Sequence, residues 1–379
     1  MRMTLVMVCS LVLLNCGGEG GTTAGTGTAT ESSSGGTSTG GEDSTGGEDS
    51  TGGPSSSGDV PTTSADTNTG DGTSTTSSSS SSGVEDSSGE PATSTTGGTT
   101  GSELDCTGVM AGPFTPELFV SGFSGSEDLA FDGKGGLALK RDGDIVVVRA
   151  DKSETTVAMN IPQASGSRYL ADGRLLVALP GDGVVIAVDA QGASTDFLGG
   201  LGGPNGIYPD TAGAVWITEF GGSRLLRIDA DQTETTIVTG GLASSANGVV
   251  YDPQRSLVFY TNYQGGQVRR VAIDAMGMPG EPEVVTMIDG APDGLALDAC
   301  GNLYIVDQGN SRVFRALLDE LGEASEAASE LAEFPSNVAN AQFGVGEGFD
   351  AQTLYLAGNP GDVYTLALEF PGAPIASVQ

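Results

Sequence analysis

The sequence contains no histidine and little positive charge. Its 379 residues include 15 Lys and Arg against 49 Asp and Glu, which gives a formal net charge of −34. Without His, a Ser-His-Asp triad, a Cys-His pair, a His-ligated zinc site and an imidazole general base are all excluded. The negative charge also argues against nucleic acid as a partner, because a nucleic-acid-binding surface needs clustered Lys and Arg. The remaining chemistry is that of carboxylates, amides, hydroxyls and a hard cation bound by oxygen.

Long apolar runs are scarce, and the run near the N-terminus is short. Residues 3–14 are too few to span a bilayer and are typical of a secretory signal. Cys16 follows directly, which resembles bacterial lipoprotein signals, whose Cys is lipidated and becomes the mature N-terminus. Residues 1–16 therefore predict a lipoprotein-type signal peptide. We expect an exported protein, lipid-anchored in the cell envelope at the outer membrane or cell surface of a Gram-negative bacterium. The alternative is an ordinary signal cleaved elsewhere, since Asn15 stands where a small residue is usual.

Residues 17–103 offer almost no apolar side chains to bury. Residues 17–100 include twelve acidic residues and no Lys or Arg, with the near-repeat GGEDSTGGEDSTGG at 40–53. Burial cannot repay the entropy of ordering such a segment, so we predict a disordered acidic Gly/Ser/Thr linker. Residues 104–379 are then the folded domain. From residue 101 onward the chain keeps 37 of the acidic and 14 of the basic residues, a net charge of −23.

Cysteine is also rare, with four in the whole chain. Cys9 would be lost with the signal, and Cys16 would carry the lipid. The remaining two, Cys106 and Cys300, are expected to form a disulfide in an oxidising compartment. Two free thiols are the alternative.

The folded part repeats. Six segments each contain a turn residue, a short apolar strand, a Gly/Asp turn, a second strand, a Gly-rich turn and a third strand. Equivalent positions of the six segments are spaced 42, 36, 42, 46 and 47 residues apart. This period predicts an all-β fold, a six-bladed β-propeller with four strands per blade; seven blades, one of them degenerate, are the alternative. The equivalent positions that align the six segments are Glu127, Tyr169, Asn205, Asn247, Asp293 and Asn340.

Two further segments belong to the predicted propeller. Residues 116–120 precede the first repeat, and as the outer strand of blade six they would close the ring and hide sheet edges. Residues 316–334 have the chain's one helical periodicity and are predicted to form an exposed insertion between blades five and six.

Polar residues recur at one end of the repeats. The innermost strand of a blade starts at the channel mouth where the next, antiparallel strand ends, so two sets of residues share that opening. A ring of carboxylate and amide oxygens suits one divalent cation, most favourably Ca²⁺, which takes six to eight oxygens. The expected metal ligands are Glu127, Asn205, Asn247 and Asp293, and the expected substrate contacts are Asn205, Glu219, Asn262 and Asp307. The alternative is turn chemistry alone, because Asn-Gly and Asp-Gly are common tight-turn pairs.

The segments SEDLAFD at 126–132, PNGI at 204–207, ANGVVYDP at 246–253 and PDGLALDACGNLYIVDQGNSRVFR at 292–315 carry a resemblance. They resemble the senescence-marker-protein/gluconolactonase/luciferin-regenerating-enzyme family, and are similar to the paraoxonases and strictosidine-synthase-like propellers, over residues 114–370. The resemblance implies a six-bladed propeller with one catalytic divalent ion in its channel and hydrolysis of a lactone. By position, Glu127, Asn247 and Asp293 fall on the family's metal ligands, with Asp293 also a candidate base. Asn205 falls on an amide that contacts substrate in gluconolactonases and metal in paraoxonases.

The chain lacks the catalytic His of the paraoxonases, and it departs from the pattern at three further places. Glu127 is followed by Asp128-Leu129 in place of Gly-Pro. Gly203 stands where gluconolactonases often have a substrate-binding Arg. Gly206 replaces a paraoxonase Asp, which argues against a second calcium.

Two hypotheses follow. In the first, the chain is a metal-dependent hydrolase of a small-molecule lactone or ester, with Asp293 assisting as base. In the second, it is a non-catalytic surface propeller, a binding or interaction module with a structural metal. In both, membrane contact is expected only through the N-terminal lipid, and the protein is expected to be a monomer.

Overall fold

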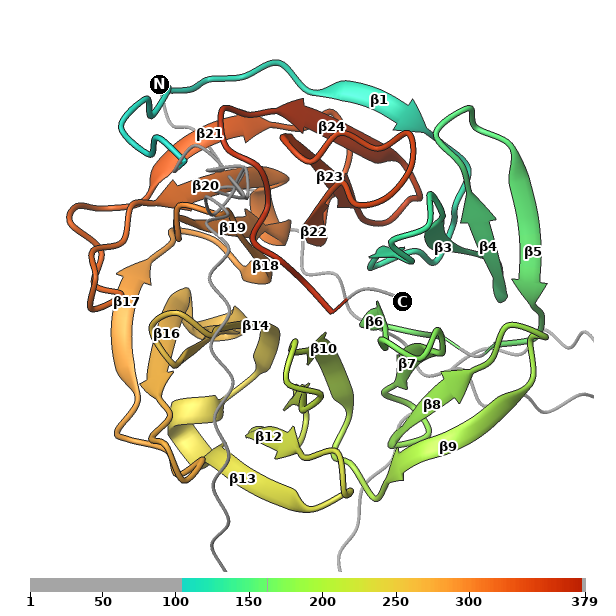
Figure 1. Ribbon diagram of the computed structural model, residues 1–379, viewed down its shortest axis with the longest axis horizontal. Helices are drawn as coiled ribbons and strands as arrows, with labels where there is room; N and C mark the ends of the chain where they lie inside the picture. Colours follow the sequence, from blue (N-terminus) through green and yellow to red (C-terminus); the bar gives the residue numbers. More distant parts are fainter. Residues whose placement is uncertain (1–103, 162, 377–379) are drawn as a thin grey trace, which may run out of the picture. The chain divides into compact units, whose positions relative to one another are not determined.

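The computed structural model describes residues 104–161 and 163–376, and these residues form a ring of six four-stranded antiparallel sheets (Figure 1). This confirms the predicted all-β, six-bladed propeller. The predicted signal peptide, Cys16 and the linker lie outside the described residues. Helices in the described part are three short 3-10 turns, none long and apolar enough to cross a membrane.

Each blade takes four strands in chain order, except that blade six borrows its outer strand from the N-terminal side. Blades one and two are β2 (Ala130–Phe131), β3 (Leu137–Arg141), β4 (Asp144–Val148) and β5 (Glu154–Ala158), then β6 (Ser167–Tyr169), β7 (Leu175–Leu179), β8 (Val184–Val188) and β9 (Ser194–Gly199). Blades three and four are β10 (Pro204–Pro209), β11 (Val215–Glu219), β12 (Arg224–Ile228) and β13 (Glu234–Thr239), then β14 (Ala246–Asp252), β15 (Leu257–Asn262), β16 (Gln267–Ala272) and β17 (Glu283–Met287). Blades five and six are β18 (Pro292–Leu297), β19 (Leu303–Asp307), β20 (Arg312–Ala316) and β21 (Ser329–Glu333), then β22 (Asn340–Phe343), β23 (Thr353–Ala357), β24 (Val363–Ala367) and β1 (Glu117–Val120). The 3-10 turns are η1 (Gly240–Ala243), η2 (Tyr263–Gly265) and η3 (Gln308–Asn310).

The hydrophobic core lies between the blades. The second strands are covered on both faces, so β7 and β19 are nearly continuous apolar runs in which every residue is buried. Outer strands such as β9 keep mostly exposed residues. Five apolar clusters together fill the interface between every neighbouring pair of blades, including blades six and one. Side-chain packing therefore holds the blades together. The ends of their strands place other side chains at the two ends of the ring.

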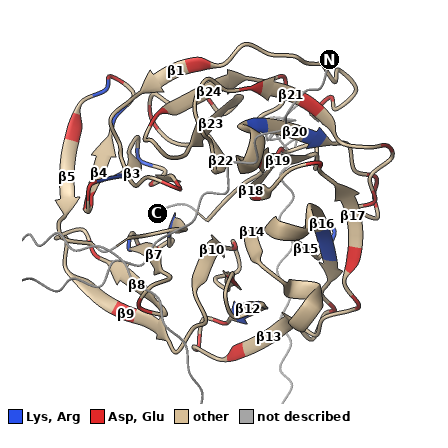
Figure 2. Ribbon diagram, turned by 180° about the vertical axis from the view of Figure 1, so that it is seen from behind, with Lys and Arg blue, Asp and Glu red and all other residues tan. Residues whose placement is uncertain are grey.

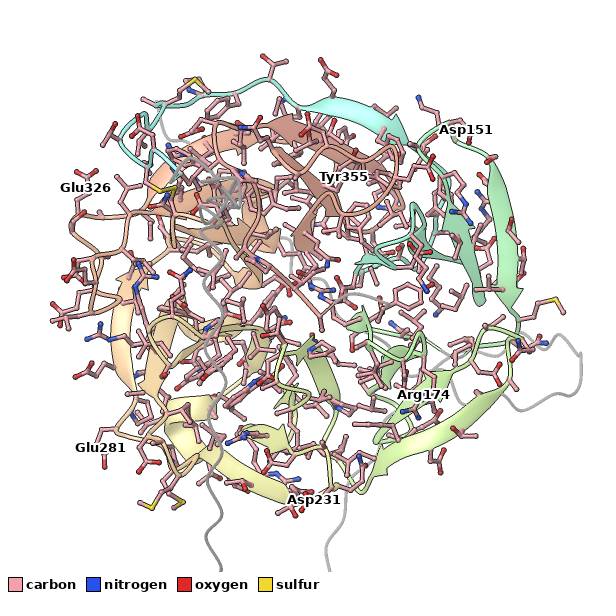
Figure 3. The ribbon with its side chains drawn as sticks, in the orientation of Figure 1. Asp151, Arg174, Asp231, Glu281, Glu326 and Tyr355 are labelled. Carbon is pink, nitrogen blue, oxygen red and sulfur yellow. A yellow bond between two sulfur atoms is a disulfide. The ribbon has the colours of Figure 1, made fainter. Side chains whose placement is uncertain are left out.

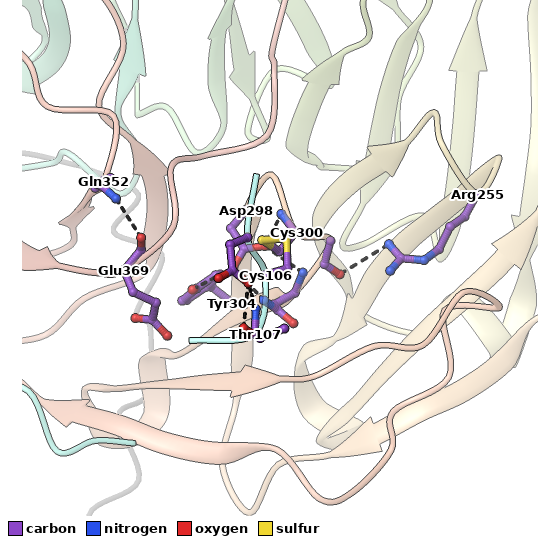
Figure 4. Close-up of a disulfide and its surroundings, with 11 residues drawn as sticks. Cys106, Thr107, Arg255, Asp298, Cys300, Tyr304, Gln352 and Glu369 are labelled. Carbon is purple, nitrogen blue, oxygen red and sulfur yellow. Dashed lines mark hydrogen bonds between the residues drawn. A yellow bond between two sulfur atoms is a disulfide. The ribbon is translucent and has the colours of Figure 1, made fainter. Parts of the chain in front are cut away.

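The ring closes as predicted, because β1 pairs antiparallel with β24 as the outer strand of blade six. Ahead of β1, the chain crosses blade five, where the Phe114 amide donates to the Leu331 carbonyl at 2.6 Å. Cys106 and Cys300 form a disulfide with their Cα atoms 5.6 Å apart (Figure 4). The N-terminal segment is thus fixed to the turn between β18 and β19.

The prediction of a helical insertion at residues 316–334 is wrong. The segment leaves β20, forms a hairpin with an isolated bridge between Leu318 and Ala324, and returns as β21. Leu331 on β21 is 0% exposed. Pairing with β20 and burying Leu331 outweigh the weak helical preference of an exposed Ala/Glu-rich segment, since propensity differences are only tenths of a kcal/mol per residue.

Much of the negative charge lies at the perimeter or in turns. The outer edge of the ring carries the projecting side chains of Asp151, Asp231, Glu281 and Glu326 (Figure 3). Figure 2 shows acidic residues along the outer strands. Other Asp residues end the inner strands and hold the following turn. Asp298 Oδ1, for example, accepts from the amides two and four residues later, both at 2.9 Å. Asp132 and Asp210 do the same in blades one and three.

The C-terminal segment lies at the far ends of the inner strands. The Ala373 amide donates to the Leu297 carbonyl at the end of β18, at 2.9 Å. Beyond it, Ile375 joins Phe131 and Phe343 in lining a cavity of about 30 Å³. The C-terminal segment thus covers this end of the inner strands, whereas the recurring polar residues lie at the other end.

Candidate functional site

The strand registers place both predicted polar sets at one end of the blades. Pro204 pairs with Glu219 in blade three, and Pro292 pairs with Asp307 in blade five. In blade four, Ala246 pairs with Asn262. The residues that start the inner strands and those that end the second strands therefore share one mouth of the ring.

The inner strands of blades three, four and five begin with the same irregularity. Their registers shift between Pro204 and Ile207, and at the same point of β14 and β18. Asn205, Asn247 and Asp293 lie in these bulges. A bulge breaks the ladder and redirects a side chain, and bulges are frequent next to active sites.

The glycines that follow these residues do not make turns, so the turn interpretation is wrong. Gly206 and Gly248 lie within strands and neither has a positive φ. A Cβ on Gly206 would lie 2.3 Å from the Asn247 carbonyl oxygen, and one on Gly248 would lie 2.1 Å from that of Asp293. Glycine is needed because adjacent inner strands nearly touch, which brings Asn205, Asn247 and Asp293 into consecutive places around the mouth.

Two threonines that the sequence analysis missed hold this arrangement. Thr261 Oγ1 accepts from the Gly248 amide at 2.8 Å and donates to the Asp293 carbonyl at 2.9 Å. Thr218 makes the equivalent contacts one blade earlier. Each Thr satisfies the amide left free by the bulge and fixes the backbone of the next blade's polar residue. The sequence shows only that both Thr precede the last residue of the second strand; their contacts with the next blade appear in the structure alone.

Asp293 is the most unusual group at the mouth. It is 3% exposed, and its Oδ2 atom has no hydrogen-bond partner in the described part of the chain. Burial, followed by the charges of Glu127 and Asp128, raises the pKa of Asp293 well above its ordinary value. Burial and the Asp128 charge raise the pKa of Glu127 to about 7, and the Lys140 ammonium opposes this shift. Glu127 of blade one and Asp293 of blade five thus act on each other across the mouth.

Asp128, the first departure from the family pattern, joins two blades. The Arg168 guanidinium of β6 lies 2.6 Å from Asp128 Oδ2, and both side chains are largely buried. The same oxygen accepts from the Ser167 amide at 2.8 Å. Asp128 thus connects the start of blade one, where Glu127 is, to the inner strand of blade two.

Glu219 and Asp307 are bound within their own blades. Glu219 is 0% exposed; it accepts from the Gly202 amide at 2.8 Å and forms an ion pair with Arg224. Asp307 accepts from the Ala291 amide at 2.9 Å and pairs with Arg312 at 2.7 Å. Both tie the loop before an inner strand to the blade.

Asn262 has the same task in blade four. Its Nδ2 donates to the Ser244 carbonyl at 2.8 Å, and its Oδ1 accepts from Arg269 at 2.9 Å. The structure gives Glu219, Asn262 and Asp307 this supporting task, and their contact with substrate stays a prediction. The sequence holds a sign of it, because GGSR at 221–224 and GNSR at 309–312 place an Arg five residues after an acid.

The remaining predicted ligands keep their oxygens available. The side chains of Glu127, Asn205 and Asn247 make no hydrogen bond within residues 104–161 and 163–376. In that same part of the chain, no three His, Cys, Asp or Glu residues gather in a group that could hold a metal. The candidate set is instead two carboxylates and two amides, and with the unpartnered Asp293 Oδ2 it suits a hard cation that takes oxygen ligands.

Comparisons with known proteins agree with this architecture. Residues 142–358 match the SMP-30/gluconolactonase/LRE-like region. A 6-deoxy-6-sulfogluconolactonase from Pseudomonas putida is 28% identical over 150 residues, which are 38% of this chain and 48% of that protein. The match thus spans about half the length of that curated relative.

Solved structures share the fold. A gluconolactonase from Xanthomonas campestris has a TM-score of 0.57 at 18% identity, covering 68% of this chain and 89% of that one. Regucalcin, a calcium-binding protein from Agrobacterium tumefaciens, has a TM-score of 0.57 at 22% identity, covering 70% and 98%.

Proposed function

The chain belongs to the SMP-30/gluconolactonase/LRE-like family, and from this premise we propose that it is a metal-dependent lactone or ester hydrolase. The observation that carries the proposal is the buried Asp293 Oδ2, which has no hydrogen-bond partner and lies at the mouth that also carries Asn205 and Asn247. The lactonase names of two similar proteins and the calcium-binding name of a third support it.

Glu127, Asn205, Asn247 and Asp293 would hold one divalent cation, with Ca²⁺ favoured by the all-oxygen donor set. When bound, such a cation supplies positive charge that polarises an ester carbonyl. The bulges fix the backbone at Asn205 and Asn247. The side-chain amides of these two residues can therefore orient a lactone without a rearrangement of the backbone. Asp293 Oδ2 has no partner to displace, and it can accept a proton from the water that attacks the carbonyl carbon.

Lactone hydrolysis by the full chain, after chelation and with or without added Ca²⁺, tests the proposal. We expect turnover only with metal, and a loss of kcat of about 10²–10⁴-fold in Asp293→Asn, the range for removing a general base. Asp289→Asn is the matched control, because this exposed Asp lies four residues earlier. Calorimetry should find one calcium site that Glu127→Gln weakens.

Calcium binding without turnover of any lactone or ester would contradict the enzyme and leave the non-catalytic binding module. Turnover that survives chelation, or that Asp293→Asn leaves intact, would reject the mechanism.

We propose further that the protein is exported and anchored by a lipid on Cys16. The Cys106–Cys300 disulfide supports an oxidising compartment. Cells fed a labelled fatty acid should incorporate label into the protein, and Cys16→Ser should abolish the label and release the protein from the membrane fraction. Equal labelling of both forms would refute the anchor.

A further inference from the structure

Three residues form a rim at the mouth that carries Asn205, Asn247 and Asp293. They are Phe220, Tyr263 and Gln308, each the first residue after the second strand of blade three, four or five. The Phe220 and Tyr263 rings meet edge to face with centroids 5.7 Å apart. The Tyr263 hydroxyl donates to Gln308 Oε1 at 2.7 Å. All three side chains are half-buried, so one face of this mouth rim stays open.

The backbone places each member of the mouth rim beside a polar residue of the site. The Phe220 amide donates to the Gly203 carbonyl at 2.8 Å, two residues before Asn205. The Tyr263 and Gln308 amides make the same contact, each to the carbonyl two residues before its blade's polar residue, both at 3.0 Å. Tyr263 also lies within the electrostatic reach of Asp293 and Glu127. The mouth rim therefore borders the site on blades three to five.

The carboxylates that end the second strands cannot recognise sugar hydroxyls, because they are already bound within their own blades. The side-chain oxygens of Glu219 and Asp307 accept from backbone amides and arginines inside their own blades. Gly203, opposite Phe220, contributes no side chain, and a Cβ there would lie 3.4 Å from the Gly221 nitrogen. A polyhydroxylated ring would lose water here without gaining equivalent partners.

The arginines of blades three to five that could bind an anionic substrate already have partners within the protein. Arg224 pairs with Glu219 and Glu234, and Arg312 pairs with Asp307 and Glu330. Arg269 donates to neighbouring side-chain amide oxygens. A domain with a net charge of −23 from residue 101 onward would also repel anions on approach.

We infer that the substrate is an uncharged lactone with an alkyl or aryl substituent, which packs against Phe220 and Tyr263 while its carbonyl faces Asn205, Asn247 and Asp293. The inference rests on the proposed hydrolase function and names its substrate class. Aromatic rings offer large apolar contact area at low entropic cost, which is what such a substituent needs.

The experiment compares glucono-δ-lactone, unsubstituted δ-valerolactone, the same lactone with a pentyl chain, and dihydrocoumarin, using the full chain with calcium. We expect kcat/KM for the pentyl and aryl lactones to exceed that for glucono-δ-lactone by at least about tenfold. Phe220→Ala should raise KM for the substituted lactones and so lower their kcat/KM about tenfold. The same variant should change kcat/KM for δ-valerolactone less than about twofold. Met276→Ala, at an apolar residue 83% exposed on a distant hairpin, is the control for lost surface.

A second measurement separates this inference from the proposed function. Calorimetry with the non-hydrolysable pentyl-substituted lactam should find binding that Phe220→Ala weakens about tenfold. Lactam binding without turnover of any lactone would overturn the hydrolase and keep the apolar preference. Turnover that favours glucono-δ-lactone, or that is indifferent to Phe220→Ala, would overturn the preference and keep the hydrolase. Neither binding nor turnover would overturn both.

Discussion

Gly206, Gly248 and Gly294 let neighbouring inner strands approach until a single methyl group would collide with the next blade. Turn-forming glycines adopt positive φ angles, and these three do not. They permit a tight contact between neighbouring backbones. This contact fixes the backbone carbonyl groups of Asn247 and Asp293. One carbon atom at these positions should therefore affect both stability and the site.

Gly248→Ala tests this directly. Its new Cβ would lie 2.1 Å from the Asp293 carbonyl oxygen, so the free energy of unfolding should fall by about 1–3 kcal/mol and calcium affinity should fall with it. Gly181→Ala is the control, because no heavy atom lies within 4 Å of its Cβ. Denaturant unfolding and calorimetry measure the two effects, and equal behaviour of the two variants would contradict the close-approach argument.

The carboxyl groups at the mouth predict a pH dependence for the metal-free protein. The pKa of Glu127 is raised from 4.5 to about 7, so the folded state holds this proton more tightly than the unfolded state does. The resulting stability is fully present below about pH 4.5 and is lost as the pH rises to about 7. Asp293 acts in the same direction.

The Tm of the chelated protein should therefore fall between about pH 5 and 7.5, and Glu127→Gln should flatten that fall. Calcium should restore stability most strongly at the upper end, because its ligands must be ionised to bind it. A chelated protein whose Tm rises across this range would argue against the raised pKa of Glu127.

At the scale of elements, β21 shows how tertiary pairing overrides a local pattern. Residues 316–334 have a helical spacing of Ala, Glu and Leu, yet β20 needs a partner strand at its outer edge. The outcome is a hairpin that places Leu331 in the core and leaves Leu321 at the solvent-exposed turn.

Two leucines in the same segment distinguish the strand from an exposed insertion. Leu331→Ala should destabilise the protein by about 2–5 kcal/mol, because Leu331 is 0% exposed. Leu321→Ala should change stability by less than about 0.5 kcal/mol, because Leu321 is 69% exposed. Urea unfolding of both variants measures the difference, which would vanish if the segment lay outside blade five.

The repeat period was enough to predict the blades and the closing strand, because spacing and alternating apolar residues follow directly from strand geometry. It also indicated which oxygens lie at one mouth. It did not distinguish a side-chain oxygen that is free to bind a ligand from one that is already bound within its own blade. Glu219 and Asp307 end their strands just as expected, yet their arginine partners lie five residues away across a hairpin. The tasks of Thr218 and Thr261 depend on the neighbouring blade, which no pattern within one repeat reveals.

At the scale of the whole molecule, the disulfide joins residues 194 positions apart. Replacing Cys106 and Cys300 together by Ala should lower the free energy of unfolding by about 2–5 kcal/mol, because the unfolded chain regains the freedom of a long loop. A reducing agent should lower the Tm of the native protein toward that of the double variant, and should leave the double variant unchanged. Identical melting of oxidised and reduced protein would show that the bond contributes nothing.

The position of Cys106, ahead of β1, also decides how the ring would respond to mechanical load. A pull applied upstream of residue 104 reaches a covalent bond into blade five before it reaches the hydrogen bonds between β1 and β24. The disulfide would thus keep the load away from the β1–β24 pairing that closes the ring. In single-molecule stretching from that end, this pairing should break at low force only after the disulfide has been reduced.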